Sequence, residues 1–312
     1  MPTPTLFLLG LLQALLVLLV APFFSGVART LRAKLHSRKG PDVWQNYRDL
    51  VKLFQRQEVV PAPAGWVYRA APYITLAATL LIAGMIPILT RESPLGRAGD
   101  AILVIYLFAL TRFFLALAGL DAGSIFAGIG AAREMGLSAL VEPTLILVLL
   151  VLSLAAGSTD LGRIAAEVAG GAVPLGSPGI WLAGAAMAVA AYIEAGKLPF
   201  DLAEAEQELQ EGPLTEYSGP PLALLKWSLY MKQVLAAALF LALFFPGGAA
   251  EVTLAGILVA LGAFLLKVLA LVVLGALVEN TMARLILFKT PEVTWVAFGL
   301  ALAAFVFQLV SL

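Results

Sequence analysis

Long apolar stretches separated by short polar segments dominate the chain. Each stretch has about 20 residues and none alternates like a strand, which is typical of helices that cross the hydrocarbon core of a bilayer. Because only helices and closed barrels satisfy their backbone hydrogen bonds in lipid, the pattern predicts an all-α polytopic membrane protein. The eight predicted spans cover residues 4–28, 70–90, 99–119, 135–157, 179–196, 222–245, 252–278 and 292–311.

Two of the polar segments have helical patterns of their own. Between Val43 and Phe54, apolar residues recur at helical spacing opposite charged ones. This predicts a short amphipathic helix on the membrane surface, and a solvated basic loop is the alternative. From Asp201 to Glu211, acids recur at steps of three and four, and the spacing of Asp201 and Glu204 fits a capping box. We therefore expect a second short helix with one carboxylate face.

A third segment between spans is rich in glycine and other small residues. It reads GLDAGSIFAGIGAARE and covers residues 119–134. Its composition predicts a re-entrant or tightly folded segment held against other helices, because non-helical backbone at membrane depth needs protein or a cavity around it.

Composition supports a membrane protein and narrows its chemistry. Of the 312 residues, 61% are hydrophobic and 13% are charged, with a mean hydropathy of +0.95. A typical soluble domain has roughly 25% charged residues. The chain has no cysteine and one histidine, His36, which excludes thiolate-ligated iron–sulfur clusters, zinc sites and a haem held between two histidines. The net charge is zero, and nothing in the sequence indicates nucleic-acid binding.

The basic residues predict the orientation, since they concentrate in cytoplasmic loops. Alternation of the spans places fourteen on one side: Arg29, Arg32, Lys34, Arg38, Lys39, Arg48, Lys52, Arg56, Arg69, Arg133, Lys197, Lys226, Arg284 and Lys289. The other side receives only Arg91, Arg97 and Arg163. We therefore expect one integral membrane domain over residues 1–312, with both termini outside and with loops 29–69, 120–134, 195–221 and 279–291 in the cytoplasm.

The most unusual polar segment is acidic. Residues 194–219 read EAGKLPFDLAEAEQELQEGPLTEYSG and contain one lysine and seven carboxylates, which are Glu194, Asp201, Glu204, Glu206, Glu208, Glu211 and Glu216. Like charges at helical spacing repel and raise one another's pKa, which suits proton uptake. We interpret the segment as a proton-binding surface or a landing site for a partner. A solvated surface helix is the alternative.

Several charged residues lie inside the predicted spans. They are Arg112, Glu142, Glu194, Lys232, Lys267 and Glu279, and Glu134 precedes Glu142 on the same helix face. A charge at the centre of a bilayer costs roughly 3 kcal/mol or more, so such residues usually face the bundle interior and mark an ion or proton route. Together with the acids of residues 194–219 they form our candidate proton path. Structural salt bridges between helices are the alternative.

Three stretches, in this order, carry a resemblance to a known family: RKGPDVWQNYRDLVKLFQRQEVVP, GLDAGSIFAGIGAAREMGLSALVEP and the acidic segment. They resemble the H-subunit family of respiratory complex I, in its hydrogenase branch, the membrane anchors of formate hydrogenlyase and hydrogenase-4. The chain keeps that family's PFDL, EAE and TEYSG elements. It lacks the GPxGxLQP portion that lies beside the quinone chamber in complex I, and this departure favours the hydrogenase branch.

The resemblance implies a non-redox membrane subunit of an energy-converting NiFe hydrogenase complex. The subunit would lie between a soluble arm of hydrogenase large and small subunits with iron–sulfur subunits and a membrane arm of antiporter-like subunits. The NiFe centre and the iron–sulfur clusters would belong to those partners, with no cofactor in this chain. Glu142, Glu194 and the acids of residues 204–216 match the family's charged proton channel. The residues expected to dock the soluble arm are Arg38, Lys39, Arg48, Asp49, Lys52, Arg56 and Tyr217.

The resemblance also implies the cytoplasmic (inner) membrane of a prokaryote. Two other functions stay open at this point. One is the quinone-site H subunit of a complex I-type NADH:quinone oxidoreductase. The other is a stand-alone ion transporter, a class that usually carries internal repeats.

Overall fold

The computed structural model describes residues 4–173, 176–203, 206–249 and 253–311, and within these ranges it contains helices and no strand. Eight apolar helices follow the order of the eight predicted spans. They are α1 (Pro4–Leu35), α3 (Trp66–Met85), α4 (Ala101–Asp121), α5 (Ile125–Ala156), α7 (Pro178–Glu194), α9 (Gly219–Phe244), α10 (Leu254–Thr281) and α11 (Thr290–Ser311). Seven of them are long and apolar enough to cross a membrane, and α7 is shorter, with 17 residues. The all-α membrane fold is confirmed.

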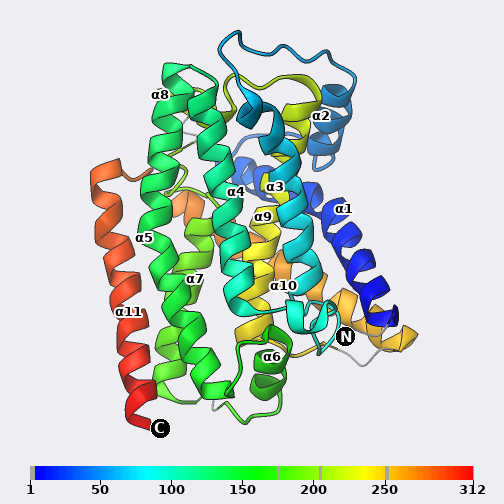
Figure 1. The fold of residues 1–312 in the computed structure, drawn as a ribbon, viewed down its shortest axis with the longest axis vertical. Helices are drawn as coiled ribbons and strands as arrows, with labels where there is room; N and C mark the ends of the chain where they lie inside the picture. Colours follow the sequence, from blue (N-terminus) through cyan, green and yellow to red (C-terminus); the bar gives the residue numbers. More distant parts are fainter. Residues whose placement is uncertain (1–3, 174–175, 204–205, 250–252, 312) are drawn as a thin grey trace.

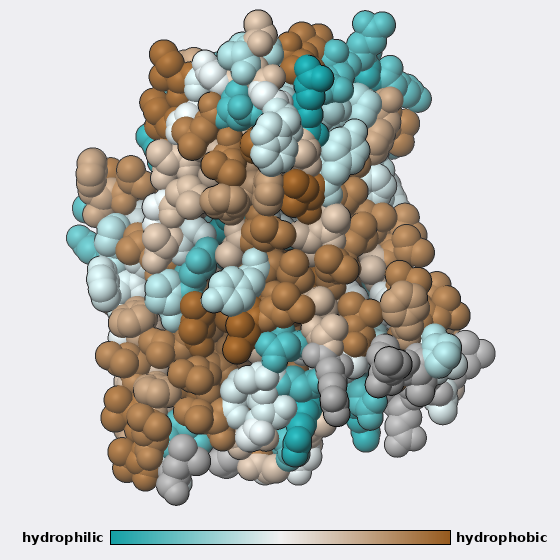
Figure 2. Space-filling model, viewed as in Figure 1, coloured by the Kyte–Doolittle hydropathy of each residue, from teal (hydrophilic) through white to brown (hydrophobic). Residues whose placement is uncertain are grey.

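The helices form a bundle with two different ends. Figure 1 shows α2 (Gln45–Phe54) and α8 (Glu206–Leu209) at one end, and α6 (Leu161–Ala169) and the C-terminus at the other. The N-terminal part of α1 also points toward the α6 end. Figure 2 shows hydrophobic residues over most of the middle of this face, and hydrophilic residues gathered at the α2 end.

Helix α10 differs from the other long helices because it runs obliquely behind the bundle (Figure 1). It packs mainly against α1, whereas α11 returns to pack against α7 and α5. Much of α10 and α11 presents large hydrophobic side chains at the surface, including Leu258, Leu266, Val296 and Phe307. Such a surface is what lipid or a hydrophobic partner subunit covers.

Helix starts follow local chemistry. The Asp100 carboxylate accepts from the backbone N–H groups of Ile102 and Leu103 at the start of α4. Ser177 caps α7, whose first residue is Pro178, and Thr253 caps α10 in the same way. These side chains satisfy backbone donors that a helix start leaves unpaired. The segment that follows α5 contains a helix, α6, which was not predicted from the sequence.

The amphipathic helix is confirmed as α2. Leu50 and Asn46 face inward, and α2 packs on α9 and α1. The Asn46 side chain accepts from Arg29 Nη1 at 2.7 Å and donates to the Pro22 carbonyl at 3.0 Å. A buried amide with both groups bonded fixes α2 against α1.

The re-entrant form predicted for residues 119–134 was wrong, whereas its alternative, a tightly folded segment held against other helices, agrees with the structure. Helix α4 continues to Asp121, a three-residue turn follows, and α5 begins at Ile125. The turn needs glycine, because Gly123 has φ +69°, in the left-handed region. The small residues instead allow close helix packing. A Cβ on Gly130 would lie 2.7 Å from Pro213 Cδ in the short 3-10 helix η2 (Gly212–Leu214).

The prediction of a helix from Asp201 to Glu211 with one carboxylate face was also wrong for the described residues. Residues 201–203 are not helical, helix α8 covers Glu206–Leu209, and the Asp201 carboxylate is bound by Arg284. The predicted capping box involves Glu204, which lies outside the described residues. Carboxylates on one helix face repel one another. Here the described ones separate and meet different basic side chains.

Candidate functional site

Four charged side chains from four helices meet inside the bundle. They are Arg112 of α4, Glu134 of α5, Glu194 at the end of α7 and Lys232 of α9. Glu194 accepts from Arg112 Nη2 at 2.7 Å and lies 3.2 Å from Lys232 Nζ. Glu134 lies 3.4 Å from Arg112 Nε and 3.7 Å from Lys232 Nζ. We call these four residues the ion cluster.

Each charge in the ion cluster contacts both opposite charges, and the cluster has no net charge. The side chains of Arg112, Glu134, Glu194 and Lys232 are 3%, 12%, 4% and 8% exposed. Burial of a single charge is costly, but a paired and hydrogen-bonded set offsets much of that cost. Arg112, Glu194 and Lys232 were predicted from their place in apolar spans and Glu134 from its helical spacing to Glu142, and the structure brings all four together.

A small cavity connects the ion cluster with the acidic segment. It has a volume of about 40 Å³ and is lined by residues of the cluster together with Asp201, Gly196, Pro213 and Gln233. A cavity of this size with polar walls has room for water. Glu134 is the most exposed member of the cluster, so it is the acid best placed to exchange a proton with this space.

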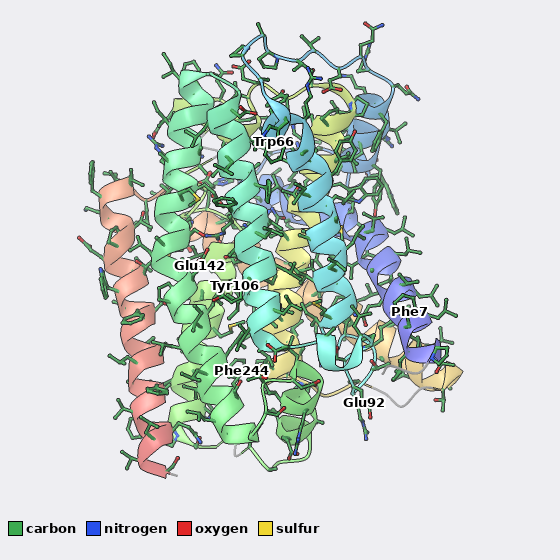
Figure 3. The ribbon with its side chains drawn as sticks, in the orientation of Figure 1. Phe7, Trp66, Glu92, Tyr106, Glu142 and Phe244 are labelled. Atoms are coloured by element: carbon green, nitrogen blue, oxygen red, sulfur yellow. The ribbon has the colours of Figure 1, made fainter. Side chains whose placement is uncertain are left out.

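Glu142 does not join the ion cluster. It lies on α5 at mid-height of the bundle (Figure 3), and its carboxylate accepts a hydrogen bond from Ser138 one turn earlier. Within the described ranges it makes no ion pair. Its helix face continues from Glu134, as the spacing predicted, but the two carboxylates have separate partners.

Lys267 and Glu279 on α10 are also apart from the ion cluster. Lys267 Nζ donates to the carbonyls of Phe245 and Gly247, just past the end of α9. Glu279 is buried and pairs with Arg32 Nη1 at 3.3 Å, beside a mostly apolar cavity of about 200 Å³ between α1, α7, α9 and α10. The depth of a residue along a span cannot predict these contacts, because α10 is oblique and packs on α1.

The acids of the acidic segment have partners on three different elements. Arg284, between α10 and α11, donates from Nε to Asp201 at 2.9 Å. Arg133 of α5 pairs with Glu208 at 2.7 Å, and Lys226 of α9 pairs with Glu211 at 3.0 Å. The side chain of Glu206 is not among those described. From the sequence, these three basic residues contributed only to the predicted orientation, and their pairing with the acids was not predicted. The signal was present, since all three were predicted on the same side as the acids.

Two tyrosines fasten the end of the acidic segment to α3. Tyr68 donates to the Glu216 carbonyl at 2.7 Å, and Tyr217 donates to the Tyr68 carbonyl at 2.6 Å. Their rings stack with centroids 4.0 Å apart. Tyr217 is buried, so its side chain supports the segment from inside. Its role in partner docking stays a prediction.

The other predicted docking residues are at the surface of the α2 end. The exposed members are Arg38, Lys39, Arg48, Lys52 and Arg56. Asp49 is partly buried and accepts from Gln45 at 2.8 Å. Arg48 pairs with Asp42 at 2.9 Å, an exposed contact of low expected energy. These residues belong to α2 and its flanking segments, and α2 lies at the same end of the bundle as α8 of the acidic segment (Figure 1).

Replacing Tyr217 with phenylalanine is expected to lower the free energy of unfolding by about 1 kcal/mol, because the Tyr68 carbonyl loses its donor. Burial of the Tyr217 side chain, and to a smaller extent the neighbouring Tyr68, raises the pKa of Tyr217 well above its ordinary value. The unfolded chain therefore loses the Tyr217 proton at a lower pH than the folded chain does. The contribution of Tyr217 to the free energy of unfolding is complete below about pH 10 and falls as the pH rises further. When thermal unfolding is measured in detergent, the Tm of Tyr217→Phe should fall less steeply with rising pH above about 10 than the Tm of the native chain.

The matched control for that measurement is Tyr73→Phe, since the Tyr73 side chain is exposed on the same helix as Tyr68. It should unfold like the native chain at every pH. An equal alkaline loss in Tyr217→Phe and the native chain would contradict the assignment.

Comparison with known proteins identifies clear relatives. The family model described as NADH dehydrogenase matches residues 8–309. Hydrogenase-4 component C of Escherichia coli is 51% identical over 98% of this chain and 97% of its own length. Formate hydrogenlyase subunit 4 of the same organism is 49% identical over 95% of this chain and 96% of its own length. In a structure of the membrane-bound sulfane sulfur reductase, an archaeal respiratory membrane complex, one chain superposes with a TM-score of 0.85 at 25% identity, covering 96% of this chain and 99% of that one.

Proposed function

The chain belongs to the NADH dehydrogenase family, and from this membership we propose that it is the membrane subunit of a NiFe-hydrogenase complex of the formate hydrogenlyase or hydrogenase-4 type. It holds the soluble hydrogenase arm at the membrane and carries part of a proton path. The observation that carries the proposal is the ion cluster, in which four helices each contribute one buried charge.

The chemistry of the ion cluster suits proton transfer. Arg112 keeps its charge at all physiological pH values, so it acts as a fixed positive charge. Glu134, Glu194 and Lys232 are the members that can gain or lose a proton. Because the cluster is neutral and poorly solvated, one added or removed proton changes the energy of every remaining charge. A change of charge at the docked arm would therefore shift the pKa values of the acidic segment and then those of the cluster.

The α2 end is the proposed docking surface for the soluble arm. Basic side chains of α2 and its flanking segments lie on the same end as the acidic segment (Figure 1). The soluble arm would carry the NiFe centre and the iron–sulfur clusters on hydrogenase large and small subunits and iron–sulfur subunits. Antiporter-like membrane subunits and lipid would cover apolar helix faces such as those of α10 and α11.

The proposal includes an orientation. The α2 end, with loops 29–69, 195–221 and 279–291, would face the cytoplasm of a prokaryote, and both termini would lie outside the cytoplasmic membrane. Residues 1–312 would then form one integral membrane domain. The separation of α2 from the C-terminus along the bundle supports this arrangement.

The experiment that tests the function uses a tagged chain in its native membrane. Hydrogenase subunits should co-purify with it, and inverted vesicles that evolve hydrogen should show proton movement that a protonophore abolishes. If the hydrogenase co-purifies but hydrogen evolution moves no protons, the chain docks the hydrogenase and does not carry a proton path. Quinone reduction by the purified complex would instead identify the quinone-site alternative.

Charge reversal on α2 should release the soluble arm. We expect Arg48→Glu combined with Lys52→Glu to reduce the co-purifying hydrogenase by about tenfold or more, because like charges opposed across an interface cost several kcal/mol. Insertion of the chain in the membrane should not change. The measurement is the amount of hydrogenase retained per tagged chain at low and high salt.

The control for the docking variant is Arg163→Glu, an exposed charge reversal on α6 at the opposite end of the bundle. It should retain the hydrogenase fully. Loss of the hydrogenase in both variants would mean that charge reversal acts through expression, and full retention in both would contradict docking at α2.

A further inference from the structure

A second, smaller cavity adjoins the ion cluster. Its volume is about 10 Å³, and Arg112 and Lys232 line both it and the cavity shared with the acidic segment. The remaining polar lining consists of four hydroxyl side chains, Thr75 and Thr79 of α3, Thr111 of α4 and Ser228 of α9. All four hydroxyl residues are buried. Two members of the ion cluster therefore line both an acidic cavity and a hydroxyl-lined one.

The guanidinium of Arg112 is incompletely bonded by protein. Its Nε and Nη2 reach the carboxylates of Glu194 and Glu134. Its Nη1 is fully buried and has no acceptor among the described residues. A buried donor without a partner costs about 1–3 kcal/mol, and more when it is charged. This nitrogen belongs to a side chain that lines the hydroxyl cavity.

The hydroxyl groups of the cavity are donors to their own helices. Thr111 donates to the Phe108 carbonyl at 2.7 Å, and Ser228 donates to the Leu224 carbonyl at 2.7 Å. Thr75 and Thr79 donate in the same way within α3. Because each hydroxyl hydrogen is already used, the oxygens offer only lone pairs to the cavity.

We propose that this cavity binds one water molecule, which accepts a hydrogen bond from Arg112 Nη1 and donates to two hydroxyl oxygens of its lining. The volume matches a single water, since one requires roughly 10–15 Å³. An anion would face four hydroxyl oxygens that offer only lone pairs, and a cation would lie beside Arg112 and Lys232. A neutral molecule with one acceptor site and two donors satisfies the groups that are present.

The water would also extend the polar route beyond the ion cluster. It would link Arg112 to the threonines of α3, which line the hydroxyl cavity and not the acidic one. This relay role rests on the proposed proton function, whereas the binding of the water does not.

A structure of the purified complex, at a resolution that shows buried waters, tests the binding. We expect density about 2.7–3.2 Å from Arg112 Nη1 in the native protein. The density should be lost in Thr111→Val with Ser228→Ala, in which the lining loses two acceptors. It should remain in Thr294→Val, because Thr294 is an equally buried threonine that donates within α11, away from this cavity. Absence of the density in the native protein, with other buried waters visible, would overturn the proposal whether or not the variant folds.

Vesicle measurements test the relay separately. Thr111→Val with Ser228→Ala should lower hydrogen-linked proton movement by about tenfold, the effect of roughly 1.4 kcal/mol on a rate. The single substitution Thr111→Ser keeps the hydroxyl, so proton movement in this variant should equal that of the native protein. Native rates of hydrogen-linked proton movement in a variant that has lost the water would overturn the role of the water as a relay. A native complex that moves no protons would overturn the proposed function instead, and the density would still decide the water.

Discussion

Replacing Glu194 with glutamine is expected to abolish hydrogen-linked proton movement and to lower the free energy of unfolding by about 3–5 kcal/mol. Glutamine has nearly the same shape, so the change removes charge and little packing. Arg112 and Lys232 would then share only Glu134, which lies 3.4 and 3.7 Å from them, and the cluster would have a net charge of +1. A buried positive charge without its partner is the costly outcome. Thermal unfolding in detergent and proton movement in vesicles measure the two effects.

A second substitution separates stability from proton transfer. Glu194→Gln combined with Lys232→Met restores a neutral cluster, so we expect most of the lost stability to return. Proton movement should stay absent, because two of the three members able to exchange a proton are gone. Glu92→Gln is the matched control, since Glu92 is exposed near the α6 end (Figure 3), and it should leave both properties unchanged. Native coupling in Glu194→Gln would remove the ion cluster from the proton path.

The second large effect is expected from one methyl group on α5. Gly130→Ala places a Cβ 2.7 Å from Pro213 Cδ, 2.8 Å from Gly212 Cα and 2.9 Å from the Ala203 carbonyl oxygen. Contacts this short require backbone to move, so the acidic segment must shift away from α5. We expect a loss of about 1–3 kcal/mol in the free energy of unfolding, as for other overpacked sites. The segment should also become sensitive to limited proteolysis and retain less hydrogenase.

The same helix provides the control for this substitution. Gly128 lies one half-turn earlier, and a Cβ there meets nothing within 4 Å. Gly128→Ala should therefore stabilise the chain by about 0.5–1 kcal/mol, the usual gain of alanine over glycine in a helix. Opposite signs at positions 128 and 130 support close packing of η2 on α5. Equal stabilisation of both variants would show that the acidic segment is not held there.

The buried charges were the part of the site that the sequence predicted best. Arg112, Lys232 and Glu194 are conspicuous because their neighbours in the chain are apolar and because a charge in lipid is costly. Such residues are expected to find partners inside the protein, and those of the ion cluster do. Which residues become the partners does not follow from the cost of a charge in lipid. Lys267 satisfied the same criterion and binds carbonyls beyond the end of α9.

The acidic segment shows where local pattern fails. The spacing of Asp201, Glu208 and Glu211 matches a helix, yet each of these carboxylates is held by a basic residue from a different element. Three separate ion pairs avoid the repulsion that one acidic face would produce. Helical spacing is a property of nearby residues, whereas Arg284 is 83 positions from Asp201.

By itself, the sequence determined that the chain is a helical membrane protein, where its apolar helices run and which charges must leave the lipid. The physical reason is local. The free energy of transfer from water to lipid is favourable for an apolar stretch and unfavourable for an isolated charge, and it follows from the residues themselves. The tertiary structure alone decided that four of those charges form one neutral cluster, that α10 places Lys267 and Glu279 elsewhere, and that Asp201, Glu208 and Glu211 separate. These outcomes depend on helix tilt and on contacts between residues far apart in the chain, which spacing along the sequence does not contain.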